Sequence, residues 1–377
     1  MDFSLTEQQE MLRLSARGFL STECPKARVR ELDRDEKGYD PHLWHRMAEL
    51  GWLGLVFPEE YGGMAGSFLD LTILMEEMGR NLVPVPFFST IALCALPLLE
   101  YGTPEQKKRF LPQIAKGEAI WTLALLESSG KYEAAEIRLK AVLRDKNYLI
   151  HGRKLFVPDA HIADYILVAA RTEESKRLED GITLFIVDAK APNMKIDIMP
   201  TIGGNKQCRV SFDRVRAHED SIVGTASDGW QVLDFILQRA AVLKCAEASG
   251  ACQAILDMAN SYAKERIQFD RPIGSFQAIQ HRLADMLIEV EAVQYLLYQA
   301  AWGISVGLPS RWQISAAKAK ANQVFQQICI HAIGIHGAIG YTMDHDVGLY
   351  YRRAKAMEFA GGDSDIHREI VASELGL

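Results

Sequence analysis

The sequence predicts an α+β protein with an N-terminal helical domain, a middle antiparallel β-barrel or sandwich, and a C-terminal bundle of four long helices. The main observation is that the hydrophobic period changes twice: it is helical over residues 1–118, strand-like over 119–226 and helical again over 227–377. A second observation is size, because 377 residues with 48% hydrophobic content can bury more than one core.

Start signals place the helices of the first domain. Thr6 or Ser4 can cap a first helix, and Pro41 opens another. An apolar stripe predicts a helix over Leu69–Met78. Thr103 supplies a cap, followed by proline at the first helical position and an acid in the first turn. The first 118 residues are therefore expected to be almost entirely helical.

The middle domain is expected to be built from short strands. Its apolar runs are rich in β-branched and aromatic residues and are separated by turn signals, with no helical pattern between them. This spacing predicts an antiparallel barrel or sandwich. The runs lie at residues 141–144, 148–151, 165–170, 182–187 and 210–212.

The last domain contains three helical segments of more than 20 residues each, over 232–269, 276–306 and 311–335. Long helices joined by short links predict an antiparallel bundle. Between the first two, Arg266, Phe269 and Arg271 surround a turn, and Ser275 can cap the next helix. A cation and an aromatic ring beside a helix N-terminus can hold a phosphate-bearing ligand, although ordinary surface charge at a helix corner is the alternative.

Composition excludes several classes of function. A net charge of -7 argues against a nucleic-acid binder, and no apolar run reaches the length of a membrane span. The N-terminus lacks a basic region followed by an apolar one, and none of the six cysteines forms a CxxC pair. The histidine spacing matches no metal site. We expect a soluble cytoplasmic protein with reduced thiols and no metal.

Several motifs together resemble the acyl-CoA dehydrogenase family over nearly the whole chain. They are Gly51-Trp-Leu-Gly-Leu-Val-Phe-Pro-Glu-Glu-Tyr-Gly-Gly, Glu76-Glu-Met-Gly-Arg, Gly102-Thr-Pro-Glu-Gln, Gly152-Arg-Lys, the corner around Arg266, and His336-Gly-Ala-Ile-Gly-Tyr-Thr. Their number and order carry the resemblance. The helix, β, helix order expected from the hydrophobic pattern is the architecture of that family.

The resemblance implies an FAD enzyme that oxidises an acyl-CoA thioester to the 2,3-enoyl-CoA, as in β-oxidation and in lipid or steroid catabolism. A carboxylate removes the α-proton while the β-hydride passes to the flavin. The resemblance also implies an electron-transfer flavoprotein as electron acceptor and a tetramer of two dimers, with cofactors at the dimer interfaces.

The family's usual base is missing. Alignment places Gly361 at the C-terminal position of the catalytic glutamate, and Ala240 at the other position known in the family. Glu247, on the same expected helix as Ala240, is our candidate base, and Glu358 is the reserve candidate. The alternative is that Glu247 is a buried structural carboxylate paired with an arginine such as Arg239.

We expect Glu247 to lie on an apolar face of small residues beside space that a ligand could fill, where burial favours a base. Its neighbours at helical spacing are Leu243, Gly250, Ala251 and Ala254.

The flavin contacts within the chain are altered. The resemblance assigns Leu126, Phe156 and Val157 to the cofactor, but Tyr132 replaces a serine that helps to hold cofactor and CoA, and Pro158 replaces a threonine beside the flavin ring. Proline offers neither a hydroxyl nor a backbone N–H. We expect the N–H of Asp159 to replace the lost donor, and Phe156 to keep the aromatic cover.

The contacts that the family donates across the dimer interface persist. The resemblance assigns Arg266, Gln268 and Phe269 to the flavin of the neighbouring subunit. It also assigns Ile335, Gly337 and Ala338, near the end of the last long segment, to the cofactor.

Three hypotheses follow for the whole chain. It is an FAD-dependent dehydrogenase that uses Glu247, or a catalytically incomplete subunit that donates Arg266, Gln268 and Phe269 to a partner, or a family member turned to another reaction or a structural role. The second resembles bacterial enzymes with two kinds of subunit, which act on bulky steroid or side-chain thioesters. Homo-oligomer and hetero-oligomer both remain open.

Overall fold

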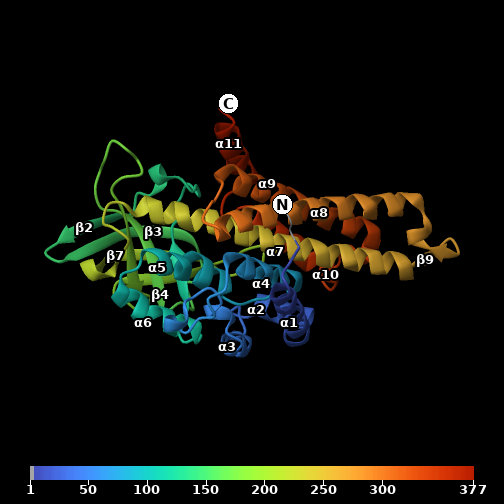
Figure 1. Cartoon of the computed structure of the whole chain (residues 1–377), viewed down its shortest axis with the longest axis horizontal. Coiled ribbons are helices and arrows are strands. Elements are labelled where there is room, and N and C mark those ends of the chain that lie inside the picture. The colour runs from blue at the N-terminus through green and yellow to red at the C-terminus, as the bar shows by residue number, and fades with distance from the viewer. Residues whose placement is uncertain (1–3) are drawn as a thin grey trace.

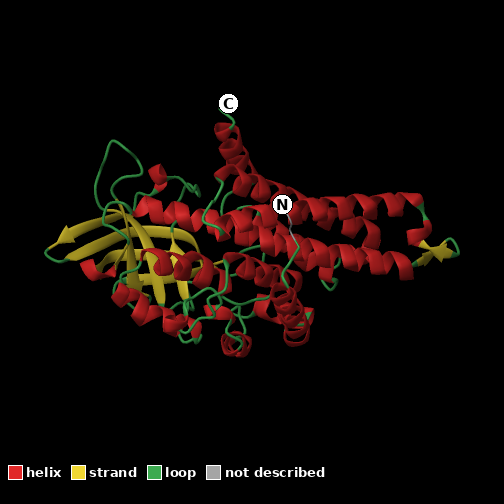
Figure 2. Cartoon of the chain, in the orientation of Figure 1, coloured by secondary structure: helices red, strands yellow, loops and turns green. Residues whose placement is uncertain are grey.

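The order of helices, sheet and helices is confirmed by the computed structural model, which describes residues 4–377. The sheet lies at one end of an elongated molecule and a small β-hairpin lies at the other, joined by the long C-terminal helices (Figures 1 and 2). The N-terminal helices pack along one side of this axis (Figure 1). Among the described residues, no helix has both the length and the hydropathy needed to cross a bilayer.

The N-terminal helices begin where the cap signals predict. Thr6 and Thr103 both form capping boxes, with Gln9 and Gln106 as their reciprocal partners. Ser67 forms a third box at the start of the helix that the apolar stripe predicts. The elements are α1 (Glu7–Glu23), α2 (Lys26–Arg34), α3 (Pro41–Glu49), α4 (Phe68–Asn81), the π-helical segment η3 (Phe88–Ala95), α5 (Leu96–Tyr101) and α6 (Pro104–Ala115).

The middle domain is one sheet in the order β6-β7-β3-β2-β4-β5-β8, with β1 beside β4. The main strands are β1 (Trp121–Ala124), β2 (Lys140–Arg144), β3 (Asn147–Pro158), β4 (Tyr165–Arg171), β5 (Ile182–Asp188), β6 (Met194–Met199), β7 (Gln207–His218) and β8 (Ile222–Val223).

The expectation of a purely antiparallel sheet is wrong at two pairings. β1 and β2 both run parallel to β4. The long connection after β1 permits this, because a parallel partner needs a crossover of a dozen residues or more. Strand β6 was also not predicted, although its sequence Met194-Lys-Ile-Asp-Ile alternates apolar and polar residues.

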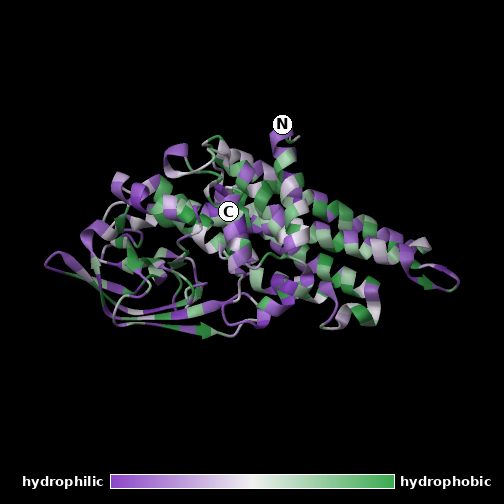
Figure 3. Ribbon diagram, turned by 90° about the horizontal axis from the view of Figure 1, so that it is seen from below, coloured by the Kyte–Doolittle hydropathy of each residue, from purple (hydrophilic) through white to green (hydrophobic). Residues whose placement is uncertain are grey.

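Of the four long helices expected in the C-terminal domain, the described residues contain three, α7 (Gly229–Glu265), α8 (Gln277–Ser305) and α9 (Arg311–His336). The shorter helices α10 (Asp346–Met357) and α11 (Ser364–Glu374) pack against α9. Hydrophobic and hydrophilic residues alternate along the bundle helices, as expected for helices that bury one side (Figure 3).

The corner between α7 and α8 differs from the expectation. It is a two-stranded hairpin of β9 (Ile267–Gln268) and β10 (Arg271–Pro272), followed by one short helical turn. Ser275 does not cap α8, because its Oγ donates to the Pro272 carbonyl at 2.7 Å and α8 begins at Gln277.

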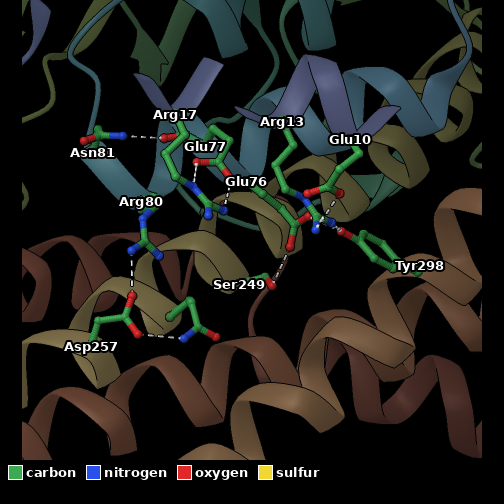
Figure 4. A network of polar contacts seen from close by, with 11 residues as sticks. Glu10, Arg13, Arg17, Glu76, Glu77, Arg80, Asn81, Ser249, Asp257 and Tyr298 are labelled. Carbon is green, nitrogen blue, oxygen red and sulfur yellow. Dashed lines mark hydrogen bonds and ion pairs between the residues drawn. The ribbon is translucent and has the colours of Figure 1, made fainter. Parts of the chain in front are cut away.

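Helix α4 packs on α7 at backbone contact, and a polar network fixes the pair (Figure 4). Tyr298 and Ser249 donate to the two oxygens of the buried Glu76 carboxyl at 2.6 and 2.8 Å. Arg80 of α4 forms an ion pair with Asp257 of α7 at 2.6 Å. The network holds α4 against α7 and α8.

Candidate active site

The two positions from which the family supplies its base come together in space. A Cβ built on Gly361 would lie 3.7 Å from the N and Cα atoms of Ala241 and 3.9 Å from the carbonyl carbon of Ala240. Gly361 has a φ of +77°, which favours glycine. The loop after α10 therefore rests on α7 where either base would stand, and neither position carries a carboxylate.

Glu247 lies two helical turns further along α7, on the same face as Ala240, because seven residues complete almost two turns. Its Oε2 accepts from Lys244 Nζ at 2.6 Å, and its side chain is 22% exposed. The alternative of an arginine partner such as Arg239 is wrong, because the partner is Lys244 and Arg239 stacks on the Phe235 ring at 3.3 Å. Burial lowers the pKa of Arg239 to about 10.

The expectation of open space along the small residues beside Glu247 is also wrong. Helix α4 fills it, because a Cβ on Gly79 would lie 2.0 Å from the Glu247 carbonyl oxygen. Likewise, a Cβ on Gly250 would lie 1.8 Å from the Glu76 carbonyl oxygen. The accessible part of Glu247 is therefore its carboxyl end, which points to Lys244.

Glu358 has a structural role. Its Oε1 accepts from the N–H and the hydroxyl of Ser364 at 3.0 and 2.7 Å. Its Oε2 accepts from Gln326 at 2.9 Å. These bonds hold the carboxyl at the start of α11, so the structure does not favour the reserve candidate as a base.

Tyr132 bridges the middle domain to the vacant base position. Its hydroxyl donates to the Phe359 carbonyl at 3.1 Å and accepts from the Gly361 N–H at 3.2 Å. Burial raises the pKa of Tyr132, so the phenol stays protonated at neutral pH. Tyr132 thus fastens the loop in which the resemblance led us to expect a catalytic glutamate.

The expected flavin contacts of the chain itself lie along the ends of β1 and β3. The Leu126 carbonyl accepts from the Leu155 N–H at 2.8 Å, which holds the two segments together. An irregular register between Lys154 and Val157 leaves the Phe156 side chain 47% exposed while Val157 is buried. An aromatic surface is therefore present where the sequence predicts it.

Asp159 does not replace the lost donor as expected, because its N–H donates to the Lys206 carbonyl at 3.2 Å. Its carboxyl instead accepts from Ser89 Oγ of η3 at 2.6 Å. Burial raises the pKa of the Asp159 carboxyl. The contact of the Asp159 carboxyl with Ser89 was not predicted, because only the backbone N–H of Asp159 was expected to contribute.

Arg266, Gln268 and Phe269 lie at the far tip of the α7–α8 connection, and all three are exposed. Phe269 and Asp270 form the two-residue turn of the hairpin, with φ of +54° and +62°. Both values are those of a type I′ turn, which aspartate tolerates in place of the family's glycine. The turn holds the Phe269 ring 87% exposed.

The remaining cofactor candidates lie where α9 ends. Gly337 and Ala338 are exposed, whereas the Ile335 side chain is buried and offers no side-chain contact. A Cβ on the adjacent Gly334 would lie 3.1 Å from Nη1 of Arg282 in α8, which places this segment at the hairpin end of the bundle. The sheet and the hairpin lie at opposite ends of the elongated molecule, so the two halves of the expected flavin site cannot meet within one copy (Figure 1).

Lys244 and the residues around it were missed by sequence reasoning. Lys244 Nζ lies 3.9 Å from the centre of the Phe88 ring. Spacing of three residues between Lys244 and Glu247 on a helix was the available signal for the ion pair. Among residues 4–377, no group of three or more His, Cys, Asp or Glu side chains could hold a metal ion.

The chain matches three domain families along its length: the N-terminal domain of acyl-CoA dehydrogenase over residues 6–118, the middle domain over 122–215 and the C-terminal domain over 227–376. It therefore belongs to the acyl-CoA dehydrogenase family, whose members are FAD-dependent oxidoreductases acting on CH–CH groups.

Relatives match the chain end to end. A probable acyl-CoA dehydrogenase, YngJ, from Bacillus subtilis is 33% identical and covers 100% of both chains. The structure of butyryl-CoA dehydrogenase from Megasphaera elsdenii superposes with a TM-score of 0.94 at 28% identity, covering 100% of each chain. The ChsE4-ChsE5 complex from Mycobacterium tuberculosis contains a chain with a TM-score of 0.91 at 28% identity, covering 100% of this chain and 99% of that one.

The residues present fit FAD when they are divided between two copies or two kinds of chain. The exposed Phe156 offers an aromatic contact near the sheet, and the exposed Arg266 offers a cation for a pyrophosphate at the hairpin. Pro158 and the engaged N–H of Asp159 leave the sheet side short of donors. The hairpin side of the site is thus better preserved than the sheet side.

Proposed function

We propose that the chain is an FAD-dependent acyl-CoA dehydrogenase that converts an acyl-CoA thioester to its 2,3-enoyl-CoA, with Glu247 as the base. The observation that carries this proposal is the position of the Glu247 carboxyl. It is partly exposed, bound to a cation, and on the face of α7 that bears the vacant base position. Side chains on a helix lean towards its N-terminus, so Glu247 leans back towards Ala240.

The proposed chemistry divides the work between the chain and its cofactor. Bound FAD supplies the hydride acceptor. Glu247 takes the α-proton at its carboxyl oxygen, and Lys244 faces that carboxyl. Phe156 offers the flavin an aromatic surface, whereas the buried Val157 offers it no side-chain contact. Arg266, Gln268 and Phe269 serve the flavin of the adjoining subunit. We expect an electron-transfer flavoprotein to reoxidise the cofactor.

The base assignment is tested with Glu247→Gln in the flavin-loaded protein. Flavin bleaching by an acyl-CoA thioester should fall by at least about a thousandfold, because a general base is lost. Glu358→Gln is the matched control on the other candidate carboxylate, and it should bleach within about tenfold of the unmodified protein. Persistent bleaching in Glu247→Gln would exclude Glu247 as the base.

A second candidate function has its own support. The Tyr132 hydroxyl contacts the Phe359–Gly361 loop. Near the sheet, Pro158 has no hydroxyl and the Asp159 N–H is already bonded, so the chain's own half of the flavin site has few free hydrogen-bond donors. The other half of the site, at the hairpin, is exposed and has the arginine, glutamine and phenylalanine that the resemblance leads us to expect. We therefore propose as the alternative that the chain is a catalytically incomplete subunit that donates Arg266, Gln268 and Phe269 to a second dehydrogenase-like chain. Similarity to a chain of a two-component complex supports this reading.

Visible spectra separate the two functions. The chain purified alone should carry about one flavin per copy, and the flavin should bleach with acyl-CoA, if the first function holds. A colourless chain that acquires flavin only with a co-expressed second dehydrogenase-like chain would support the alternative.

A further inference from the structure

We infer that Lys244 is a positioning residue for Glu247, whose ammonium orients the carboxylate along α7 towards the vacant base position. This inference rests on the proposed function of Glu247. It concerns a residue that the sequence motifs of the family do not include.

The first support is the geometry on α7. Ala240, Lys244 and Glu247 occupy one face of the helix at intervals of four and three residues. Lys244 therefore stands between the vacant position and the carboxylate. The 2.6 Å contact from Lys244 Nζ to Glu247 Oε2 shows that the carboxylate leans towards the N-terminus of α7, in the direction of that position.

The second support is the aromatic ring above the cation. Lys244 Nζ lies 3.9 Å from the Phe88 ring centre, and the lysine side chain is only 14% exposed. A cation over a ring face is stabilised independently of its anionic partner. When Glu247 takes up a proton and loses its charge, Phe88 still gives the ammonium a favourable place, so the arrangement persists through the reaction.

The third support is that Phe88 itself is fixed. It begins η3, and the next residue, Ser89, is bonded to Asp159 of the turn between β3 and β4 at 2.6 Å. A π-helical turn is rare and is frequently found at functional sites. Helix α7, segment η3 and the sheet thus meet around Lys244.

Other charged groups do not substitute for Lys244. Lys318 of α9 acts electrostatically on Lys244 and Glu247, but its Nζ donates to Asn322 Oδ1 and to the Met357 carbonyl at 3.2 Å. Asp159 is acted on by Lys244 and bonds Ser89. In the part of the chain that the structure describes, Lys244 is the cation in direct contact with the Glu247 carboxyl.

The test compares Lys244→Met, which keeps length and ring contact but removes the charge, with Lys244→Arg, which keeps the charge. The flavin-loaded protein is used, alone or with the co-expressed chain that supplies its flavin. The first readout needs no substrate: the time course of labelling of Glu247 by a water-soluble carbodiimide at one fixed pH, mapped by mass spectrometry. The rate of labelling should rise at least about threefold in Lys244→Met, because the carboxyl loses the contact that holds it, and return in Lys244→Arg.

The second readout is flavin reduction by straight-chain, branched and sterol side-chain acyl-CoA thioesters. In Lys244→Met, kcat should fall about tenfold to a hundredfold with KM changed by less than about threefold, and Lys244→Arg should recover most of kcat. Lys195→Met breaks an exposed 2.9 Å pair with Asp197 in the middle domain and is the control, with no change in either readout.

The two readouts keep this inference separate from the proposed function. An unchanged labelling rate in Lys244→Met, or an unchanged kcat, would overturn the positioning role. If bleaching persists in Glu247→Gln while the labelling rate still rises in Lys244→Met, the proposed base fails and the ion pair stands as a structural feature only.

Discussion

Gly79 of α4 packs directly against the backbone of Glu247, so closely that a Cβ on Gly79 would lie 2.0 Å from the Glu247 carbonyl oxygen. The candidate base is therefore held from behind by a helix of the N-terminal domain. Gly250 makes the reciprocal close approach to the Glu76 carbonyl, so the two helices meet at two points. The separation of α4 and α7 is set by the absence of side chains at these positions, and it determines where the Glu247 carboxyl stands.

Gly79→Ala should therefore lower both stability and activity. The new methyl group must push α4 from α7, and overpacking of this kind costs about 1–3 kcal/mol. Chemical denaturation should show that loss, and flavin bleaching should slow because Glu247 moves with the α7 backbone. Gly18→Ala in α1 is the matched control: it has open space around it and should raise the free energy of unfolding by up to about 1 kcal/mol. Equal effects of the two variants would contradict the close-packing account.

Much of the fold could be predicted because its signals are local. The capping boxes at Thr6 and Thr103 and the apolar stripes of the long helices are each contained within a few turns of chain. The parallel pairing of β1 with β4 could not be predicted, since the strand pattern carries no information about which partner lies alongside.

The candidate site was likewise only partly predictable from the sequence. The two vacant base positions and the exposed hairpin residues follow from motifs. The partner of Glu247, the covering of its small-residue face by α4, and the use of the Asp159 N–H by Lys206 depend on contacts between distant segments. A helical pattern shows which residues share a face, but not which element covers that face.

Tyr132→Phe should release the loop that carries the vacant base position. The variant keeps the ring but loses the hydroxyl that contacts the Phe359 carbonyl and the Gly361 N–H. We expect amide hydrogen exchange to quicken over residues 359–363 and stability to fall by about 0.5–1.5 kcal/mol, the worth of an ordinary hydrogen bond. Tyr148→Phe in the sheet, whose hydroxyl is remote from that loop, should leave exchange there unchanged. Unaltered protection of the loop in Tyr132→Phe would show that the bridge does not hold it.

Glu76→Gln should make the free energy of unfolding less sensitive to a rise in pH. Burial raises the pKa of Glu76, so between its ordinary pKa and the raised one the folded state holds more protons than the unfolded state. The free energy of unfolding therefore falls as pH rises through that window. Glutamine cannot ionise, and its amide can donate to Ser249 while its carbonyl accepts from Tyr298.

The stability of Glu76→Gln relative to the unmodified protein should thus grow from pH 5 to pH 8, as measured by denaturant titration at each pH. Glu105→Gln, an exposed change in the first turn of α6, should show no such trend. A difference that shrinks with rising pH would mean that the ionised carboxylate is the form that the network favours.

Phe269→Ala should separate folding from cofactor binding. The ring is 87% exposed at the tip of the hairpin and lies edge-on to Phe276 at a ring-centre distance of 6.0 Å. Its removal should change the free energy of unfolding of the isolated chain by less than about 0.5 kcal/mol. Under the proposed function, the ring serves the flavin of an adjoining subunit and is covered in the assembly. Flavin content and the fraction of assembled protein, measured by absorbance and light scattering, should therefore fall together. Leu178→Ala, an exposed position in the middle domain, should affect neither. Full flavin content in Phe269→Ala would show that the hairpin tip does not serve the cofactor across the interface.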